Sequence, residues 1–278
     1  MTTSAIPLVP VPLTADQAQA MRHLQIKKHH VAMMLLHWFN AVVWLCELLT
    51  GLALISSPHF RVAPYWYLAI VEGIFNSRAN MLQFHMGVGL MWLVVFLVYG
   101  VFGFRTYLGR EVLQKEIAMD GDDVRWLIIR TLRILGRTKA PLPPQGVYNA
   151  GQKLFAIMVY AMLPVIMVTG VIMAFRLGGP HVVGWAVVLH FVSVALVVSG
   201  LMIHVYMGTV FPEEKPAFFS MVTGSVNELH VYNHHFKWWR ETKLAELEWR
   251  QQRDALVAGA TDRPEPHDPP HSTDQGSG

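Results

Sequence analysis

The chain has little charge and almost no cysteine for its length. Of 278 residues, 15% are charged and 53% are hydrophobic, whereas about 25% of an ordinary soluble domain is charged. The single cysteine, Cys46, excludes a disulfide framework, a thiolate zinc site, an iron–sulfur cluster held by this chain alone and the covalent attachment motif of c-type haem. The formal charge of only +3 gives no basic field suited to nucleic acid. Any redox chemistry must therefore use histidine or a non-covalent cofactor.

The apolar residues form four long stretches with few ionisable side chains. A helix rises about 1.5 Å per residue and needs roughly 20 residues to cross a hydrocarbon layer about 30 Å thick. The stretches that reach this length are residues 33–55, 82–104, 152–176 and 182–211. We therefore predict an all-α integral membrane protein built as a four-helix bundle.

Basic residues between and at the edges of these spans are distributed unevenly. Nineteen of the 22 Lys and Arg residues lie before the first span, from the end of the second to the first residues of the third, or after the fourth, and only Arg61, Arg78 and Arg176 lie in or at the edge of the other two connections. Because Lys and Arg are enriched in cytoplasmic loops, we expect both termini and the middle loop in the cytoplasm. Residues 1–13 lack a basic start, so a cleavable signal peptide is not expected.

The rest of the chain divides by composition. Residues 1–28 are predicted to form a flexible arm, and residues 29–215 the four-span domain. Apolar residues recur at helical spacing among charges in residues 123–135, and residues 237–256 mix Trp, Leu and alternating charges in the same way, which predicts amphipathic helices on the cytoplasmic side, the second within a helical C-terminal segment 216–257. Residues 258–278 are polar and proline-rich, which is typical of a disordered tail.

Four histidines lie inside the predicted spans, where ionisable side chains are costly and usually face the protein interior. His190 and His204 are 14 residues apart on the fourth span, so both rings point from nearly the same face at different depths. His37 lies at the depth of His204, and His85 at the depth of His190. Two axial imidazoles of one haem come from different helices at one depth, so this pattern predicts two haems, one held by each pair. Polar contacts at separate helix interfaces are the alternative.

Glu47 is the one acidic residue within the predicted spans. It lies ten residues after His37, near the middle of the bilayer and on a face turned by roughly 80°. Either a proton-relay role or a hydrogen bond to a neighbouring helix explains it.

Several strings in the sequence resemble one known family. They are His37-Trp38, residues 148–153 (YNAGQK), residues 203–207 (IHVYM) and residues 234–241 (HHFKWWRE). Over roughly residues 28–250 the chain is similar to the gamma subunit of respiratory formate dehydrogenases, a membrane di-haem cytochrome b. The family usually has proline where this chain has Phe236, and the resemblance assigns no role to Glu47.

The resemblance implies a specific set of ligands and partners. It implies two haem b groups, held on the cytoplasmic side by His37 and His204 and on the outer side by His85 and His190. It also implies a quinone site lined by three residues near the cytoplasmic haem, namely Asn149, Gly151 and Gln152. The partners would be an iron–sulfur subunit and a catalytic dehydrogenase subunit in a bacterial inner membrane.

Three alternatives are left open by the sequence. Asn149 is equally suited to be the N-cap of a helix, because an asparagine oxygen satisfies free backbone N–H groups there. The histidine spacing also fits the cytochrome b anchor of a hydrogenase or a thiosulfate reductase. A non-redox transporter or membrane anchor is the remaining class.

Overall fold

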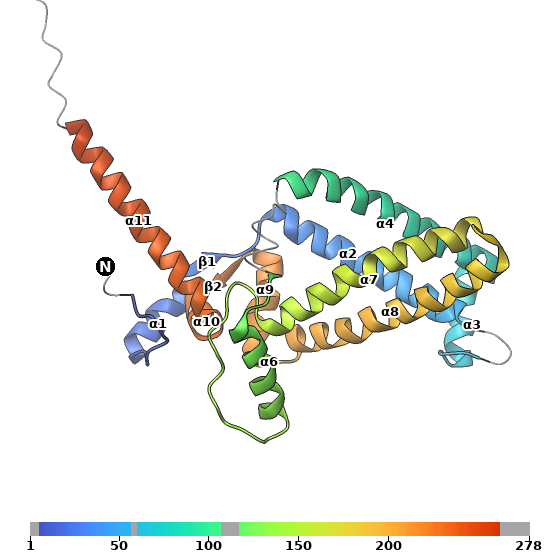
Figure 1. Ribbon diagram of the computed structural model, residues 1–278, viewed down its shortest axis with the longest axis horizontal. Coiled ribbons are helices and arrows are strands. Elements are labelled where there is room, and N and C mark those ends of the chain that lie inside the picture. The colour runs from blue at the N-terminus through green and yellow to red at the C-terminus, as the bar shows by residue number, and fades with distance from the viewer. Residues whose placement is uncertain (1–5, 57–59, 107–116, 262–278) are drawn as a thin grey trace, which may run out of the picture.

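The computed structural model describes residues 6–56, 60–106 and 117–261. Four long helices run side by side between two ends of the molecule (Figure 1). They are α2 (Val31–Leu54), α4 (Arg78–Thr106), α7 (Ala150–Phe175) and α8 (Gly179–Thr209). Each is long and apolar enough to cross a membrane, and many of their large apolar side chains face outward. The protein is therefore an all-α membrane bundle, as predicted.

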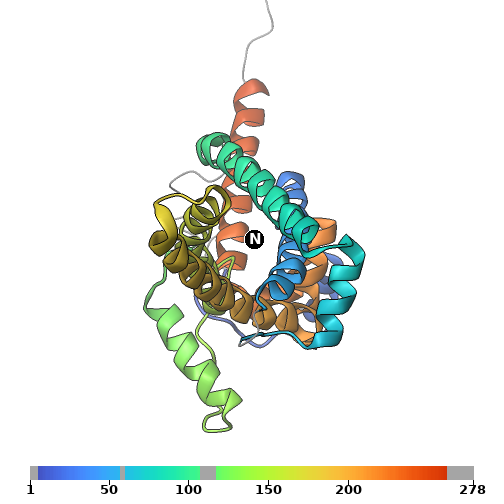
Figure 2. The same cartoon turned by 90° about the vertical axis from the view of Figure 1, so that its right-hand side faces the viewer.

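The four long helices pack as two pairs of chain neighbours. Helix α2 lies along α4 and α7 along α8, and α4 also contacts α7, so the four helices surround a common interior (Figure 2). Val43, Trp92 and Leu163 bury against one another from three of these helices. The indole of Trp92 also donates to Asn40 Oδ1 at 2.7 Å, which satisfies both polar groups inside the bundle.

Each long helix begins two to four residues before the predicted span. Hydropathy identifies only the apolar part of a span, whereas the helix itself begins directly after its N-cap residue, which lies before the apolar part. The His30 ring accepts from Ala32 N at the start of α2, and Asn149 caps α7. Helix α8 follows Gly178 in a left-handed conformation and has a proline in its first turn, a common pattern at helix starts.

A short helix, α3 (Tyr65–Phe75), covers one end of the bundle, which we call the α3 end. Ala53, Val71 and Met81 bury together where α2, α3 and α4 meet. The Tyr67 hydroxyl donates to the Leu49 carbonyl at 2.6 Å. These contacts fix the connection between α2 and α4.

The other end, which we call the polar end, carries most of the short elements (Figure 1). These are α1 (Ala15–His23), β1 (Gln25–Lys27), α6 (Gly121–Ile134), the 3₁₀ turn η3 (Pro212–Glu214), α9 (Lys215–Thr223), β2 (Ser225–Asn227), α10 (Glu228–His234) and α11 (Phe236–Thr261). Helices α6 and α11 lie where amphipathic helices were predicted, and α11 extends away from the bundle.

The N-terminal segment differs from the flexible arm predicted over residues 1–28. A capping box between Thr14 and Gln17 starts α1, and β1 pairs with β2 in an antiparallel sheet. Met21 buries in a core formed with the C-terminal segment, and the Tyr232 hydroxyl donates to Val11 O at 2.8 Å. The partners of residues 6–28 lie about two hundred residues away in the chain, so local sequence does not reveal this packing.

The predicted tail, residues 258–278, divides at the end of α11. Residues 258–261 belong to that helix, and the rest of the predicted tail lies outside the described residues.

Three buried histidines join the short elements of the polar end. His29 precedes α2, and its backbone N–H donates to the Gly224 carbonyl at 3.0 Å. Burial, with the charge of Lys28, lowers the pKa of His29 to about 4. Burial also lowers the pKa of His230 to about 3 and holds that of His235 well below its usual value. All three imidazoles are therefore neutral at neutral pH.

We expect acid to destabilise the polar end. Because the folded pKa values lie below the unfolded value of about 6.5, the unfolded chain binds more protons, and stability falls as the pH drops from about 6.5 towards 4. Thermal unfolding in detergent at pH 7.5 and 5.0, followed by tryptophan fluorescence, measures this loss. The loss should be smaller in His230→Gln than in His23→Gln, which changes an exposed ring. Equal losses in both variants would contradict the assignment.

Candidate functional site

Two half-buried histidines near the α3 end each face a threonine on the adjacent helix. His85 lies seven residues into α4, and His190 lies eleven residues into α8. Nδ1 of His85 lies 2.9 Å from the Thr50 hydroxyl of α2, and Nδ1 of His190 lies 3.0 Å from the Thr169 hydroxyl of α7. The two histidines therefore have matching surroundings on two different helix pairs.

The threonine hydroxyls fix the tautomer of both rings. Each hydroxyl donates its one proton to a carbonyl of its own helix, from Thr50 to Cys46 O at 2.8 Å and from Thr169 to Val165 O at 2.6 Å. The hydroxyl oxygen then accepts from the imidazole, so Nδ1 carries the hydrogen. Nε2 is left with a free lone pair, which is the form in which histidine binds a metal.

A glycine follows each threonine and lies under the imidazole ring. A Cβ on Gly51 would lie 3.4 Å from Cε1 of His85, and one on Gly170 would lie 3.5 Å from Cε1 of His190. The Thr-Gly pairs therefore supply both a hydrogen-bond acceptor and room for the ring.

The second pair of histidines lies near the polar end. His37 is six residues into α2, and His204 is five residues before the end of α8. Their ring centroids are 6.2 Å apart. Phe155 of α7 stacks on the His204 ring, with centroids 5.2 Å apart. The indole of Trp38, which follows His37, donates to the Met221 carbonyl at 2.9 Å. Aromatic packing and a bond to α9 thus hold this pair in place.

The separation of His37 and His204 matches two imidazoles on opposite sides of one metal. A metal–imidazole bond measures about 2 Å in proteins, and the nitrogen lies about 1 Å from its ring centroid, so two such rings have centroids about 6 Å apart. Within residues 6–56, 60–106 and 117–261, no three His, Cys, Asp or Glu side chains gather in a way that could hold an ion. Two protein ligands suit an iron whose other ligands come from a macrocycle, as in haem.

The three residues predicted to line a quinone site lie at the start of α7. Asn149 Oδ1 accepts from Gln152 N, and Gln152 Oε1 accepts from Asn149 N, both at 3.0 Å. A Cβ on Gly151 would lie 3.3 Å from Asn149 Oδ1 and 3.7 Å from the Trp126 ring. Both side-chain oxygens thus form a capping box, and the glycine allows α6 to pack against it.

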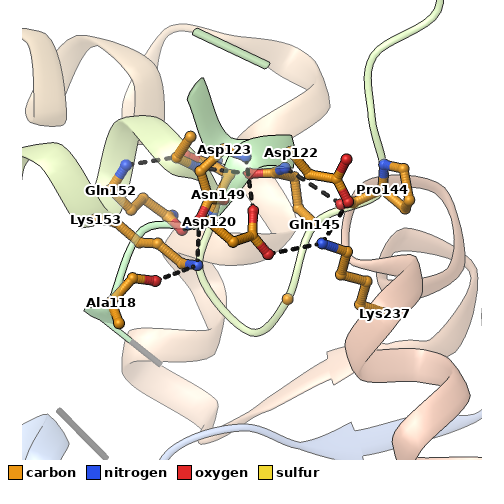
Figure 3. Close-up of polar contacts among 12 residues, drawn as sticks. Ala118, Asp120, Asp122, Asp123, Pro144, Gln145, Asn149, Gln152, Lys153 and Lys237 are labelled. Carbon is orange, nitrogen blue, oxygen red and sulfur yellow. Dashed lines mark hydrogen bonds and ion pairs between the residues drawn. The ribbon is translucent and has the colours of Figure 1, made fainter. Parts of the chain in front are cut away.

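A buried ion pair anchors α6 to the same helix start. Nζ of Lys153 lies 2.7 Å from Asp123 Oδ2, with 7% and 2% of these side chains exposed, and it also donates to the Ala118 carbonyl at 3.1 Å. Asp123 forms a second capping box with Asp120 at the start of α6. Figure 3 shows the two boxes beside each other, joined through Lys153.

The last helix joins this network through Lys237. Its Nζ lies 2.9 Å from Asp120 and 2.7 Å from Asp122. Burial alone would lower the pKa of Lys237, but these two carboxylates together raise it. Gln145 accepts from Ala150 N at 2.7 Å, and its backbone carbonyl accepts from the N–H of Lys237. This network was not predicted from the sequence, although the spacing of Asp120 and Asp123 is a capping-box signal.

Four apolar helices that enclose two pairs of histidines have the architecture of a membrane cytochrome of the b type. A family model described as prokaryotic cytochrome b561 matches residues 28–224 of the chain. The protein therefore belongs to the prokaryotic cytochrome b561 family, whose members bind haem b.

Characterised relatives are cytochrome subunits of formate dehydrogenases. The chain is 24% identical to the formate dehydrogenase cytochrome b556 subunit of Haemophilus influenzae, over 81% of this chain and 86% of the relative. It is 30% identical to the cytochrome b556(Fdn) subunit of the nitrate-inducible formate dehydrogenase of Escherichia coli, over 46% of this chain and 58% of the relative.

We expect Gly200 to be required for the packing around His204. A Cβ there would overlap Cε of Met158 and lie 2.7 Å from Cδ2 of Phe155, so Gly200→Ala should displace the ring that stacks on His204. Overpacking of this kind costs about 1–3 kcal/mol. Gly208→Ala is the matched control on the same helix, because a Cβ there meets no described atom within 4 Å. Thermal unfolding in detergent should show a lower midpoint for Gly200→Ala only, and equal midpoints would contradict this role.

Proposed function

We propose that this chain is the di-haem cytochrome b subunit of a respiratory formate dehydrogenase in a bacterial inner membrane. It would carry electrons from an iron–sulfur subunit at the α3 end to quinone near the polar end. The observation that carries this proposal is the arrangement of the four histidines as two pairs near opposite ends of one apolar bundle.

Each pair would hold one haem b. At the α3 end, the Nδ1 bonds of His85 and His190 to threonine leave Nε2 as the ligand atom. At the polar end, the 6.2 Å between the rings of His37 and His204 suits one iron between them. Bound in this way, the haems would supply one-electron transfer across the membrane.

The catalytic centre for formate would lie on a different subunit. The chain has one cysteine, too few for the Cys₄ ligation of an iron–sulfur cluster, so electrons must arrive from a partner. The named function of the two characterised relatives favours formate as the donor. The iron–sulfur and catalytic subunits of such a complex are the proposed partners.

The distribution of basic residues supports the proposed orientation. Only Arg61, Arg78 and Arg176 lie in or beside the two connections at the α3 end, while the other nineteen basic residues come before α2, from the last turn of α4 to the first turn of α7, or after α8 in the sequence. The polar end would therefore face the cytoplasm. Quinone reduced there would take its protons from the cytoplasm, so turnover would contribute to a proton-motive force.

We propose that Asn149, Gly151 and Gln152 line the quinone site. Their capping box uses the two side-chain oxygens, whereas a quinone carbonyl would accept from the amide N–H groups. The start of α7 can thus keep its capping box through the side-chain oxygens, while the amide N–H groups of Asn149 and Gln152 donate to a ligand.

The haem proposal is tested by counting haem in the purified chain. A pyridine haemochrome assay should give two haem b per chain, one in His204→Ala and one in His85→Ala, because each variant removes a ligand from a different pair. His181→Ala changes an exposed histidine of α8 and should retain both haems. A colourless protein, or one haem per wild-type chain, would refute the proposal.

The quinone site is tested with variants that keep the cap. Asn149→Asp and Gln152→Glu retain a capping oxygen but lose the amide donors. Loss of one hydrogen bond to the ligand should slow quinone reduction about tenfold, measured as reoxidation of the dithionite-reduced protein by a short-chain naphthoquinone. Haem content and melting temperature serve as controls for folding. Wild-type rates in both variants would exclude these amides from quinone binding.

A further inference from the structure

Glu47 contacts one of the proposed haem ligands directly. It lies three residues before Thr50 on α2, and its Oε2 is 2.8 Å from Nδ1 of His85. The same Nδ1 is 2.9 Å from the Thr50 hydroxyl, so its hydrogen is shared between a hydroxyl and a carboxylate. The other carboxylate oxygen, Oε1, is buried and has no hydrogen-bond partner among the described residues.

The fold leaves room for this carboxylate between α2 and α4. Gly89 lies four residues after His85, on the same face of α4, and a Cβ there would lie 3.9 Å from both oxygens of Glu47. The side chains of His85 and Glu47 are each only about one-fifth exposed. A charge in such surroundings acts more strongly on its neighbours than a charge in water does.

The surroundings of His190 provide an internal comparison. Ile166 of α7 precedes Thr169 by three residues, as Glu47 precedes Thr50. Besides the Thr169 hydroxyl, His190 has the backbone of Ile166 nearby. Both groups are neutral. The two Thr-Gly sites thus match in their hydroxyl and glycine and differ by one carboxylate.

We infer that Glu47 is a positioning residue that lowers the midpoint potential of the haem held by His85 and His190. A carboxylate that accepts from Nδ1–H makes the imidazole a stronger electron donor through Nε2, and its negative charge favours the oxidised iron. The other pair receives no such contribution from Glu47. The carboxylate would make a haem at the α3 end a poorer electron acceptor than it would be without Glu47, which would favour electron transfer towards the polar end.

This inference rests on the proposed haem ligation, and a redox titration tests the two separately. The purified chain, wild type and Glu47→Gln, is titrated while its visible spectrum is recorded. Glu47→Gln keeps the shape of the side chain and removes its charge, so one of the two midpoints should rise while the other stays unchanged. The same titration in the His204→Ala background, which should retain only the haem at the α3 end, identifies the haem that moves.

Two further variants separate charge from shape. Glu47→Asp retains the carboxylate and should keep the midpoint closer to that of the wild type than Glu47→Gln does, and it provides the comparison if the glutamine variant folds poorly. Ile166→Gln places the same amide at the matching position beside His190 and should leave both midpoints near their wild-type values. The low-spin ferric electron paramagnetic resonance signal of one haem should change in Glu47→Gln only.

The outcomes distinguish the inference from the proposed function. Two wild-type haems with one raised midpoint in Glu47→Gln would support it. Two wild-type haems whose midpoints are unchanged, or move together, would overturn the role of Glu47 and leave the proposed function intact. A wild-type chain with fewer than two haems would overturn both.

Discussion

The hydrogen bond between a histidine Nδ1 and a threonine hydroxyl is the interaction on which the α3 end of the bundle depends. An apolar span offers few partners to a ring nitrogen, and an unsatisfied polar group there is costly. The hydroxyls of Thr50 and Thr169 satisfy Nδ1 of the two rings by accepting from them, while each hydroxyl donates to a carbonyl of its own helix. The same bonds set the tautomer, so one contact between adjacent helices satisfies Nδ1 and prepares Nε2 as a ligand.

The polar end is held by capping and charge. The boxes at Asp120 and Asn149 each satisfy backbone N–H groups at a helix start, and the ion pair between Lys153 and Asp123 joins them. Removing one partner of a buried pair leaves an uncompensated charge and costs about 3–5 kcal/mol. Helix α6 therefore cannot leave the start of α7 without breaking this pair, and the proposed quinone-site residues lie on a fixed frame.

The four spans could be predicted from the sequence, because they follow from hydropathy, whereas the pairing of the histidines by depth follows from the constant rise of a helix and stays a prediction. The threonine contacts could not be predicted, since Thr50 and Thr169 look neutral within an apolar stretch and gain a role only when two helices pack. Glu47 stands out in the sequence as an acid within a span, but its partner, His85, depends on how α2 and α4 are rotated against each other. The packing of residues 6–28 depends on pairing with β2 and burial against Tyr232, which local sequence does not record.

The terminal segments also position the second pair of histidines. Trp38, next to His37, donates to the Met221 carbonyl of α9, and the Gly224 carbonyl at the end of α9 accepts from Lys28 N and His29 N just before α2. Gly224 has a φ of +79°, and a Cβ there would lie 3.1 Å from the His29 carbonyl, so only glycine fits without strain. The start of α2 is thus clamped by a segment that follows α8. Directional bonds within the spans position one pair of imidazoles, whereas the second pair depends on the contact between the start of α2 and the segment that follows α8.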